Sequence, residues 1–375
     1  MMPSFIPPDV LLLGPGPSPV PPNVRAALAR PTIGHLDPRF IGMMDEIKEL
    51  LRFAFETRNA LTLPISAPGS AGMEAAFVNL VEPGDTVVVC RNGVFGGRMR
   101  ENVVRAGATA VMVDDAFGTP IDIGKVESAL KANPGAKALA FVHAETSTGV
   151  VSDAQALCRL AREHEALAIV DAVTSLGGIP VRADAWGADA IYSGSQKCLS
   201  APPGLSPVTF SERAVDAIRA RRTQVQSWFL DLGLVMGYWQ GSGARAYHHT
   251  APINMLYALH EALLGLEAEG LEHAFARHLA HHERLRDGLA AIGLDLFVAE
   301  GARLPQLNAV RVPDGVDEAG VRRRLLEDFS IEIGAGLGEL AGRIWRIGLM
   351  GAGSTEANVD RVVAALGECL RRKAA

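Results

Sequence analysis

The sequence predicts an α/β protein whose larger part is a mostly parallel sheet covered by helices. Between residues 60 and 210, short apolar runs alternate with amphipathic segments of helical periodicity. The runs carry no polar alternation, which is typical of strands buried on both faces of a parallel sheet. The chain has 375 residues. That length favours a second, smaller domain beside the first.

The elements of the larger part can be taken in order. Proline and glycine dominate the start, so residues 1–13 are expected to form an extended arm, and a helix follows at about 39–57. The strands are expected at 86–90, 110–113, 138–142, 167–170, 190–192 and 207–210. The helices between them are expected near 71–81, 96–106, 122–132 and 153–165. This is the pattern of a doubly wound domain, whose sites lie at the carboxyl ends of the strands.

After Pro252 the pattern changes. A long helical stretch, interrupted at Gly270, runs to about residue 291. Strands near 294–298, 308–312 and 343–349, a helix at 317–329 and a terminal helix follow. We therefore expect an arm at 1–13, a large domain at 14–268 and a smaller α+β domain at 269–375.

The composition narrows the function classes. A net charge of −6 gives no reason to expect a nucleic acid or an anionic membrane as partner. The four cysteines lack CxxC spacing and a histidine cluster, which argues against a metal site and against disulfides. Neither a signal peptide nor an apolar stretch long enough to span a membrane is visible, so a cytoplasmic protein is expected.

Two strand ends carry the strongest chemical signal. The run 167–170 ends on Asp171, and the next run leads through Ser193-Gly194-Ser195-Gln196 to Lys197. The separation, 197 − 171 = 26 residues, fits one strand–crossover–strand unit, so a carboxylate and an amine leave neighbouring strands at one sheet edge. Pyridoxal 5'-phosphate needs such a pair: an amine to anchor its aldehyde and a carboxylate to keep its pyridine nitrogen protonated. Either residue alone is more often a helix cap or a surface lysine.

A phosphate site is visible independently. The loop 66–72, Ser-Ala-Pro-Gly-Ser-Ala-Gly, precedes a helix. Free N–H groups at a helix N-terminus bind phosphate, and glycine allows close approach. Many glycine loops only turn the chain, so this loop gains its meaning beside Asp171 and Lys197.

With these segments the chain resembles the class V aminotransferases of pyridoxal-phosphate fold type I. It is most similar to the branch that contains alanine–glyoxylate and serine–glyoxylate (serine–pyruvate) aminotransferases. The motifs that carry the resemblance span nearly the whole chain: LGPGP at 13–17, MDEIK at 44–48, TRN at 57–59, VEPGD at 81–85, ETSTG at 145–149, YSGSQK at 192–197, APPG at 201–204, YHHT at 247–250 and WRIGLMG at 345–351. The resemblance implies a seven-stranded, mostly parallel sheet in the large domain.

The resemblance also implies a role for each matching residue. Lys197 would be the Schiff-base lysine and proton shuttle, and Asp171 would pair with the pyridinium. Val173 and Phe95 would pack on the two ring faces, and Thr146 would contact the ring oxygen or the substrate side. The phosphate would be held by Gly69, Ser70 and Gln196, and by Tyr247 and Thr250 of a neighbouring subunit, which requires a homodimer.

Arg346 would bind the substrate carboxylate, because a guanidinium offers two parallel donors that lysine cannot reproduce. The chain departs from its relatives at two positions of the phosphate loop. Close relatives carry a hydroxyl residue or glycine in place of Pro68, and some carry histidine in place of Ser70, so the phosphate contacts are expected to differ. His248 and His249 are adjacent and lack a third ligand, and we interpret them as structural or interfacial.

The implied reaction is transamination of a small neutral amino acid, alanine or serine, with glyoxylate or pyruvate. Side-chain dicarboxylates are disfavoured because no second arginine is assignable. A ureidoglycine–glyoxylate aminotransferase and a pyridoxamine–pyruvate aminotransferase remain open, the latter because of the altered Pro68 loop. A cysteine desulfurase would need a mobile cysteine toward the C-terminus, and the only cysteine after Lys197-Cys198 is Cys369, in the terminal helix. A catalytically silent binding protein is the alternative outside the enzymes.

Overall fold

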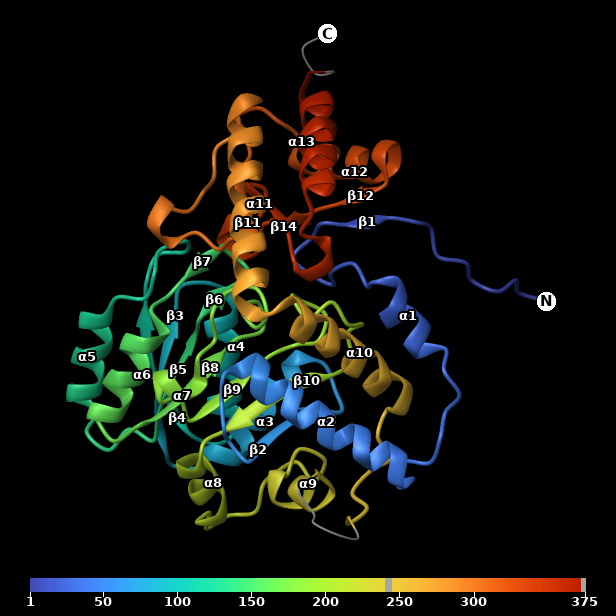
Figure 1. Ribbon diagram of the computed structural model, residues 1–375. Helices are drawn as coiled ribbons and strands as arrows, with labels where there is room; N and C mark the ends of the chain where they lie inside the picture. The colour runs from blue at the N-terminus through green and yellow to red at the C-terminus, as the bar shows by residue number, and fades with distance from the viewer. Residues whose placement is uncertain (240–244, 372–375) are drawn as a thin grey trace.

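The computed structural model describes residues 1–239 and 245–371 and confirms the α/β fold (Figure 1). Its centre is a seven-stranded sheet with the order β2-β10-β9-β8-β5-β3-β4. The strands are β2 (Leu61–Ile65), β3 (Thr86–Arg91), β4 (Thr109–Asp114), β5 (Ala138–Val142), β8 (Leu167–Asp171), β9 (Ala190–Tyr192) and β10 (Ser206–Phe210). Only β10 runs antiparallel to its neighbours, β2 and β9. The other pairs are parallel, as the unbroken apolar runs predicted.

Helices cover this sheet and its β2 edge (Figure 1). They are α2 (Pro38–Phe55), α3 (Gly69–Leu80), α4 (Val94–Arg105), α5 (Ile123–Ala132), α6 (Ala154–Glu163), α7 (Ala183–Trp186), α8 (Glu212–Arg219) and α10 (Ile253–Glu269). Sequence dictates their limits: α2 begins after Asp37, whose carboxylate accepts from the Arg39 N–H, and ends at Glu56 in a left-handed conformation.

The C-terminal part has its own sheet, with the order β11-β14-β13, and its own apolar core. Its elements are α11 (Leu271–Ala291), β11 (Leu307–Arg311), α12 (Glu318–Phe329), β12 (Ile331–Glu332), β13 (Gly334–Ala335), β14 (Ile344–Gly348) and α13 (Glu356–Arg371). The long helix α11 joins the two cores: Leu271 packs in the large one, and Leu285 and Leu289 pack in the small one. A domain boundary at residue 268 stays a proposal.

Some elements were not predicted. They are β1 (Leu11–Leu12), α1 (Pro22–Leu28), β2, β6 (Ala144–Glu145), β7 (Val150–Val151), α7, α8, α9 (Leu232–Trp239), β12, β13 and the 3-10 turns η1 (Glu300–Ala302), η2 (Gly338–Leu340) and η3 (Gly351–Gly353). The strand expected at 294–298 was wrong, because only the isolated bridge Leu296–Val310 forms there.

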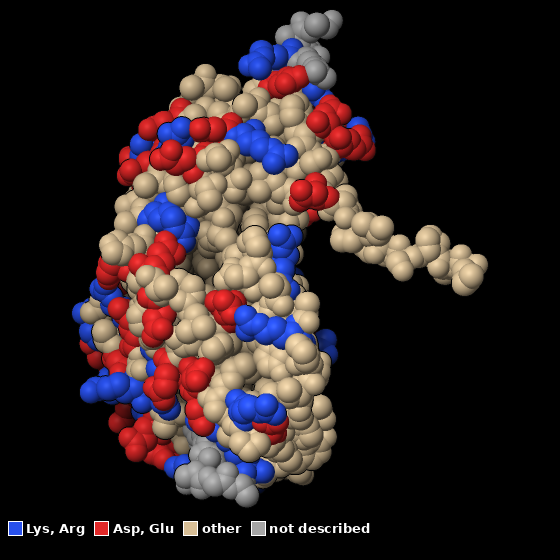
Figure 2. Space-filling model, turned by 45° about the vertical axis from the view of Figure 1, so that its right-hand side comes forward, with Lys and Arg blue, Asp and Glu red and all other residues tan. Residues whose placement is uncertain are grey.

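The surface carries both charges. Figure 2 shows Lys and Arg interspersed with Asp and Glu on the face in view. Within the described ranges, no helix is both long and apolar enough to cross a membrane. Residues 1–9 are exposed and leave the body as an extended arm (Figures 1 and 2).

Candidate active site

The two strand ends that the sequence singled out do meet. Strand β8 ends on Asp171, and its register partner on the parallel strand β9 is Tyr192. Register partners on parallel strands point to the same face, so these two side chains lie side by side. The chain then turns through residues 193–196 to Lys197, which is 9% exposed.

A cavity of about 180 Å³ lies at this edge of the sheet. Eight of the predicted cofactor residues line it: Gly69, Ser70, Phe95, Thr146, Asp171, Val173, Gln196 and Lys197. Pro68, Met73, Arg98, Val142 and Tyr192 complete the lining. Residues from five separate segments of the chain, two of them helix starts, are thus gathered around one space.

Asp171 is a buried acid. Burial raises the pKa of its carboxyl from 3.8 to about 7, and the Val173 N–H, which donates to Oδ1 at 2.9 Å, opposes that rise. The Tyr192 hydroxyl and the Lys197 charge also lower this pKa, while Glu145 raises it. A positive partner such as a pyridinium would hold the carboxyl ionised.

Lys197 is a buried amine. Burial, followed by the positive charge of Arg346, lowers its pKa from 10.5 to about 8. The segment 15–18 covers it: the lysine Nζ donates to the Pro15 carbonyl, and the Ser18 hydroxyl donates to the Lys197 carbonyl at 2.7 Å. Gly16 has φ +105°, and a Cβ there would lie 2.6 Å from Nζ. Glycine at this position is therefore what lets the segment lie on the lysine.

Apolar groups line the same cavity. Phe95, in the first turn of α4, is half-buried, and the Arg98 guanidinium stacks 4.6 Å from its ring centroid. Val173 follows the acid at the end of β8, and the Thr146 hydroxyl hydrogen-bonds to the Thr174 hydroxyl. The cavity therefore offers both apolar surface for a planar ring and polar groups at its edge.

Helix α3 begins at Gly69, and the residue before it, Pro68, provides no side-chain cap. The first N–H groups of a helix have no partner within the helix, so they remain available to an anion. Gly69 packs closely, since a Cβ there would lie 3.3 Å from the Ser193 carbonyl oxygen. Ser70 is exposed at the mouth.

The residues present fit pyridoxal phosphate. Gln196 Oε1, a buried polar atom of the lining, has no hydrogen-bond partner among the described residues, whereas the Tyr192 hydroxyl faces the Asp171 carboxyl, whose pKa it lowers. A buried polar atom without a partner is rare in folded proteins and indicates that one is missing. Together with a buried carboxylate, a buried amine and an uncapped helix start, it matches a ligand with a ring nitrogen, an aldehyde and a phosphate.

Arg346 lies on β14 and is 5% exposed. Its Nε donates to the Ala335 carbonyl at 2.7 Å and its Nη1 to the Thr146 carbonyl at 3.0 Å. These bonds use two of the five guanidinium donors. Burial lowers its pKa to about 10, and the Glu145 charge opposes that shift. Arg346 does not line the cavity itself, yet its charge acts on Lys197.

Tyr247 and Thr250 lie outside the cavity of their own chain. Tyr247 is 60% exposed, and its hydroxyl is 3.2 Å from the Thr250 hydroxyl. His248 stacks on Trp228 at 4.4 Å, and His249 Nε2 lies 2.7 Å from the Ser66 hydroxyl. The two histidine rings are nearly perpendicular, at 88°.

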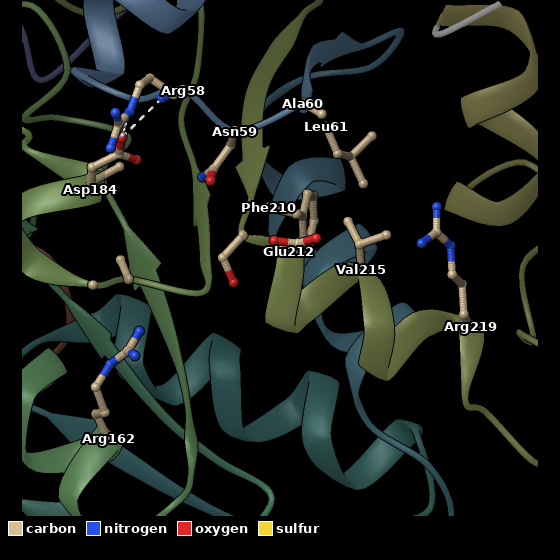
Figure 3. A pocket seen from close by; sticks show the side chains of 14 residues that line it. Arg58, Asn59, Ala60, Leu61, Arg162, Asp184, Phe210, Glu212, Val215 and Arg219 are labelled. Atoms are coloured by element: carbon tan, nitrogen blue, oxygen red, sulfur yellow. Dashed lines mark hydrogen bonds and ion pairs between the residues drawn. The ribbon is translucent and has the colours of Figure 1, made fainter.

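A larger pocket, of about 590 Å³, lies at the opposite edge of the sheet (Figure 3). Its lining residues lie at the beginnings of β2 and β9 and at the end of the antiparallel strand β10. Lys197 lies beyond the other end of β9. Arg58 and Asp184 form an ion pair of 3.5 Å there, and Arg162 and Arg219 border it from other elements. None of the predicted site residues lines this pocket.

Comparison with known proteins agrees with this geometry. The family model for class V aminotransferases matches residues 14–362. The chain belongs to the class V aminotransferase family. It is 42% identical to an alanine–glyoxylate aminotransferase of Callithrix jacchus, over 97% of this chain and 88% of the relative.

Two solved structures extend the likeness to the fold. An alanine–glyoxylate aminotransferase from Nostoc sp. has a TM-score of 0.97 at 46% identity, covering 99% of this chain and 98% of its own. A ureidoglycine–glyoxylate aminotransferase from Bacillus subtilis has a TM-score of 0.96 at 39% identity, covering 99% and 95%. This class V chain is accordingly an aminotransferase rather than a silent binding protein.

The structure adds residues to which the sequence gave no role. Tyr192 stands beside Asp171, Glu145 lies behind the cavity and Gly16 lies on Lys197. The parallel register could have found Tyr192, but the other two depend on long-range packing. Cys369 is buried in α13, which does not suit a mobile nucleophile.

Proposed function

We propose that this aminotransferase transfers the amino group of alanine or serine to glyoxylate or pyruvate, using pyridoxal phosphate. The observation that carries the proposal is the buried Arg346, whose Nη1 donates to the carbonyl of Thr146, a residue of the cavity lining that also holds Lys197. A site that presents a carboxylate-binding fork beside a reactive amine selects an α-amino acid. The names of the relatives support glyoxylate as acceptor.

Lys197 and Asp171 would have different roles in the reaction. Bound pyridoxal phosphate supplies an aldehyde for covalent attachment of amines and a ring that accepts an electron pair. Lys197 anchors it, yields its place to the substrate amine and then moves the proton at the substrate α-carbon. A lysine pKa of about 8 suits a base that works near neutral pH. Asp171 holds the proton on the ring nitrogen.

The phosphate is proposed to lie at the start of α3, on Gly69 and Ser70, with Gln196 beside it. Pro68 cannot donate an N–H, but it also brings no side chain that would cap the helix in place of the phosphate. This favours the phosphorylated cofactor, and with it an aminotransferase of amino acids over a pyridoxamine–pyruvate aminotransferase, which handles the free vitamin. A half-reaction screen with alanine, serine, ureidoglycine and pyridoxamine separates the candidates.

A homodimer is part of the proposal. Tyr247 and Thr250 are exposed, and Trp228 nearby is 62% exposed, which is unusual for a tryptophan on a monomer surface. We propose that this surface meets a second copy and that its hydroxyls reach the partner's phosphate. To test this, the molar mass from light scattering and the affinity for the cofactor are measured across one dilution series of the protein, and both are expected to fall together as the dimer dissociates. A monomer that binds the cofactor as tightly as a dimer contradicts this.

The decisive test is Arg346→Ala. Removing one partner of a buried charge pair costs about 3–5 kcal/mol, so kcat/KM for alanine or serine is expected to fall by about two to three and a half decades. Arg311→Ala is the matched control, because Arg311 is an exposed arginine of the neighbouring strand β11 and stacks on Phe297. A loss below tenfold in Arg346→Ala, or an equal loss in the control, overturns the assignment.

A further inference from the structure

Ser200 follows Lys197 in the same loop and has an unfavourable backbone conformation. Its φ is +58°, in the left-handed region that a residue with a Cβ rarely adopts. The Ser200 N–H donates to the Lys197 carbonyl at 3.0 Å, and the residue is only 5% exposed. Glycine would adopt this conformation without strain, so the presence of serine indicates that its hydroxyl has a task.

That hydroxyl binds the C-terminal part of the chain. Ser200 Oγ accepts from the Ala352 N–H at 2.8 Å. Ala352 lies in the turn η3, which comes directly after β14, the strand that carries Arg346. The two segments approach closely, because a Cβ on Gly351 would lie 2.0 Å from Ser200 Oγ. One hydroxyl thus joins the loop of Lys197 to the turn that follows Arg346.

Helix α11 holds the other side of this turn. His278 Nε2 accepts from the Gly351 N–H at 3.0 Å, and Arg277 Nη1 donates to the Gly351 carbonyl at 2.8 Å. The turn is therefore fixed to α11 independently of Ser200. Because the turn is held in this way, its bond to Ser200 sets the position of the Lys197 loop relative to β14.

We propose that Ser200 is a positioning residue of the substrate site. It keeps the Lys197 loop at the distance from Arg346 that an α-amino acid needs to reach both groups at once. The bond from Arg346 to the Thr146 carbonyl holds the guanidinium but does not hold this loop. The inference rests on the proposed function, in which Arg346 binds the substrate carboxylate. A displacement of about 1 Å between reacting groups can slow a reaction by roughly a hundredfold.

The test compares two nucleophiles on the holoenzyme. Aminooxyacetate and O-methylhydroxylamine carry the same aminooxy nitrogen, and only the first has a carboxylate. In each reaction this nitrogen replaces the Lys197 nitrogen on the aldehyde carbon of pyridoxal phosphate, the lysine leaves as a free amine, and the cofactor absorbance changes. The ratio of the two second-order rate constants therefore measures what the carboxylate contributes, and effects on the lysine alone cancel.

Ser200→Gly and Ser200→Ala both remove the hydroxyl but differ in backbone strain. Glycine relieves the strain at φ +58° and alanine keeps it, so Ser200→Gly should be the more stable of the two in thermal unfolding. The rate ratio is expected to fall by about tenfold in both variants, because both lose the bond to Ala352.

Ser200→Asn is the conservative variant. Asparagine tolerates the left-handed conformation and offers an acceptor oxygen. A cavity of about 200 Å³, lined by Ser200, Gly351 and Ala352 among others, gives the longer side chain room. The rate ratio is therefore expected to return to within about threefold of wild type.

Ser330→Gly is the matched control. Ser330 also has a left-handed conformation, with φ +53°, but it lies at the end of α12. Its replacement should leave the rate ratio at the wild-type value. Hydrogen exchange of the apoprotein gives a readout without the cofactor. The peptide that contains Ala352 should exchange faster in Ser200→Gly and Ser200→Ala than in wild type or Ser330→Gly.

The outcomes separate this inference from the proposed function. An unchanged rate ratio in Arg346→Ala overturns the carboxylate-binding role of Arg346 and this inference with it. A lowered ratio in Arg346→Ala, combined with an unchanged ratio in Ser200→Gly and Ser200→Ala, overturns the role of Ser200 alone. A fall confined to the less stable Ser200→Ala makes that role merely structural and also overturns it. A similar fall in both variants, with recovery in Ser200→Asn, is the expected result.

Discussion

The buried amine of Lys197 makes a quantitative prediction about pH. Its pKa is lowered from 10.5 to about 8, a difference of 10.5 − 8, or about 2.5 units. An amine is neutral above its pKa, so at pH 7.5 about one quarter of Lys197 side chains are neutral, against about one in a thousand for an ordinary lysine. The neutral, nucleophilic fraction of Lys197 at this pH should therefore exceed that of an ordinary lysine by more than a hundredfold. Burial slows the approach of a reagent but does not move the pH midpoint of the reaction, so the midpoint is the quantity to measure.

The assay is competitive labelling of the apoprotein with trace acetic anhydride from pH 6 to 10.5, followed by peptide mass spectrometry. Lys131, which is 63% exposed in its side chain, is labelled in the same tube and corrects for reagent reactivity. Stopped-flow mixing with pyridoxal phosphate gives an independent rate. Both rates should rise with a midpoint near pH 8.

Arg346→Gln tests the cause of the shift. Arg346 is, after burial, the largest influence that lowers the Lys197 pKa, so its removal should move the midpoint upward. A wild-type midpoint at or above about 10 would refute the reasoning, because an ordinary lysine titrates there. A midpoint that moves down in Arg346→Gln would refute the assigned electrostatic cause.

Two further outcomes are expected. Tyr192→Phe removes a hydroxyl that lowers the Asp171 pKa, so tight cofactor binding should begin about one unit higher in pH; a cofactor affinity profile with an unmoved midpoint contradicts this. Gly16→Ala places a Cβ 2.6 Å from Lys197 Nζ at φ +105°, so cofactor capture should slow by at least about tenfold. Gly301→Ala, where a Cβ would have nothing within 4 Å, should capture the cofactor as fast as wild type. An equal slowing in both variants would contradict the predicted clash between the Gly16→Ala Cβ and Lys197.

The parallel sheet and the pairing of Asp171 with Lys197 were predictable because both depend on local signals. Unbroken apolar runs mark buried strands, and polar residues directly after them lie at the functional edge. Strand β2 escaped notice because Pro64 interrupts its pattern. The structure explains that proline: β2 lies at the edge of the sheet, where a missing N–H is tolerated.

The remaining site residues were not predictable, because long-range packing places them. The bond between Lys197 and Pro15 joins positions 182 apart in the chain. Glu145 is opposite Gly93 only after β6 and α4 have packed together. The strand expected at 294–298 fails for the same kind of reason: its alternating residues form one bridge, and the chain then turns away.

The cover over Lys197 has a consequence for how the protein is made. Leu11 and Leu12 pair with Ile331 and Glu332, and the Gly348 N–H donates to the Leu13 carbonyl at 2.8 Å. A ribosome delivers the N-terminus first. The segment over the lysine thus emerges early and can bind the backbone of residues 196–197 through Ser18, but its pairing through Leu11–Leu13 waits until residues 331, 332 and 348 have been synthesised. Nascent chains can form the central sheet before that point, so the cover over the reactive amine lacks its second attachment until the last part of translation.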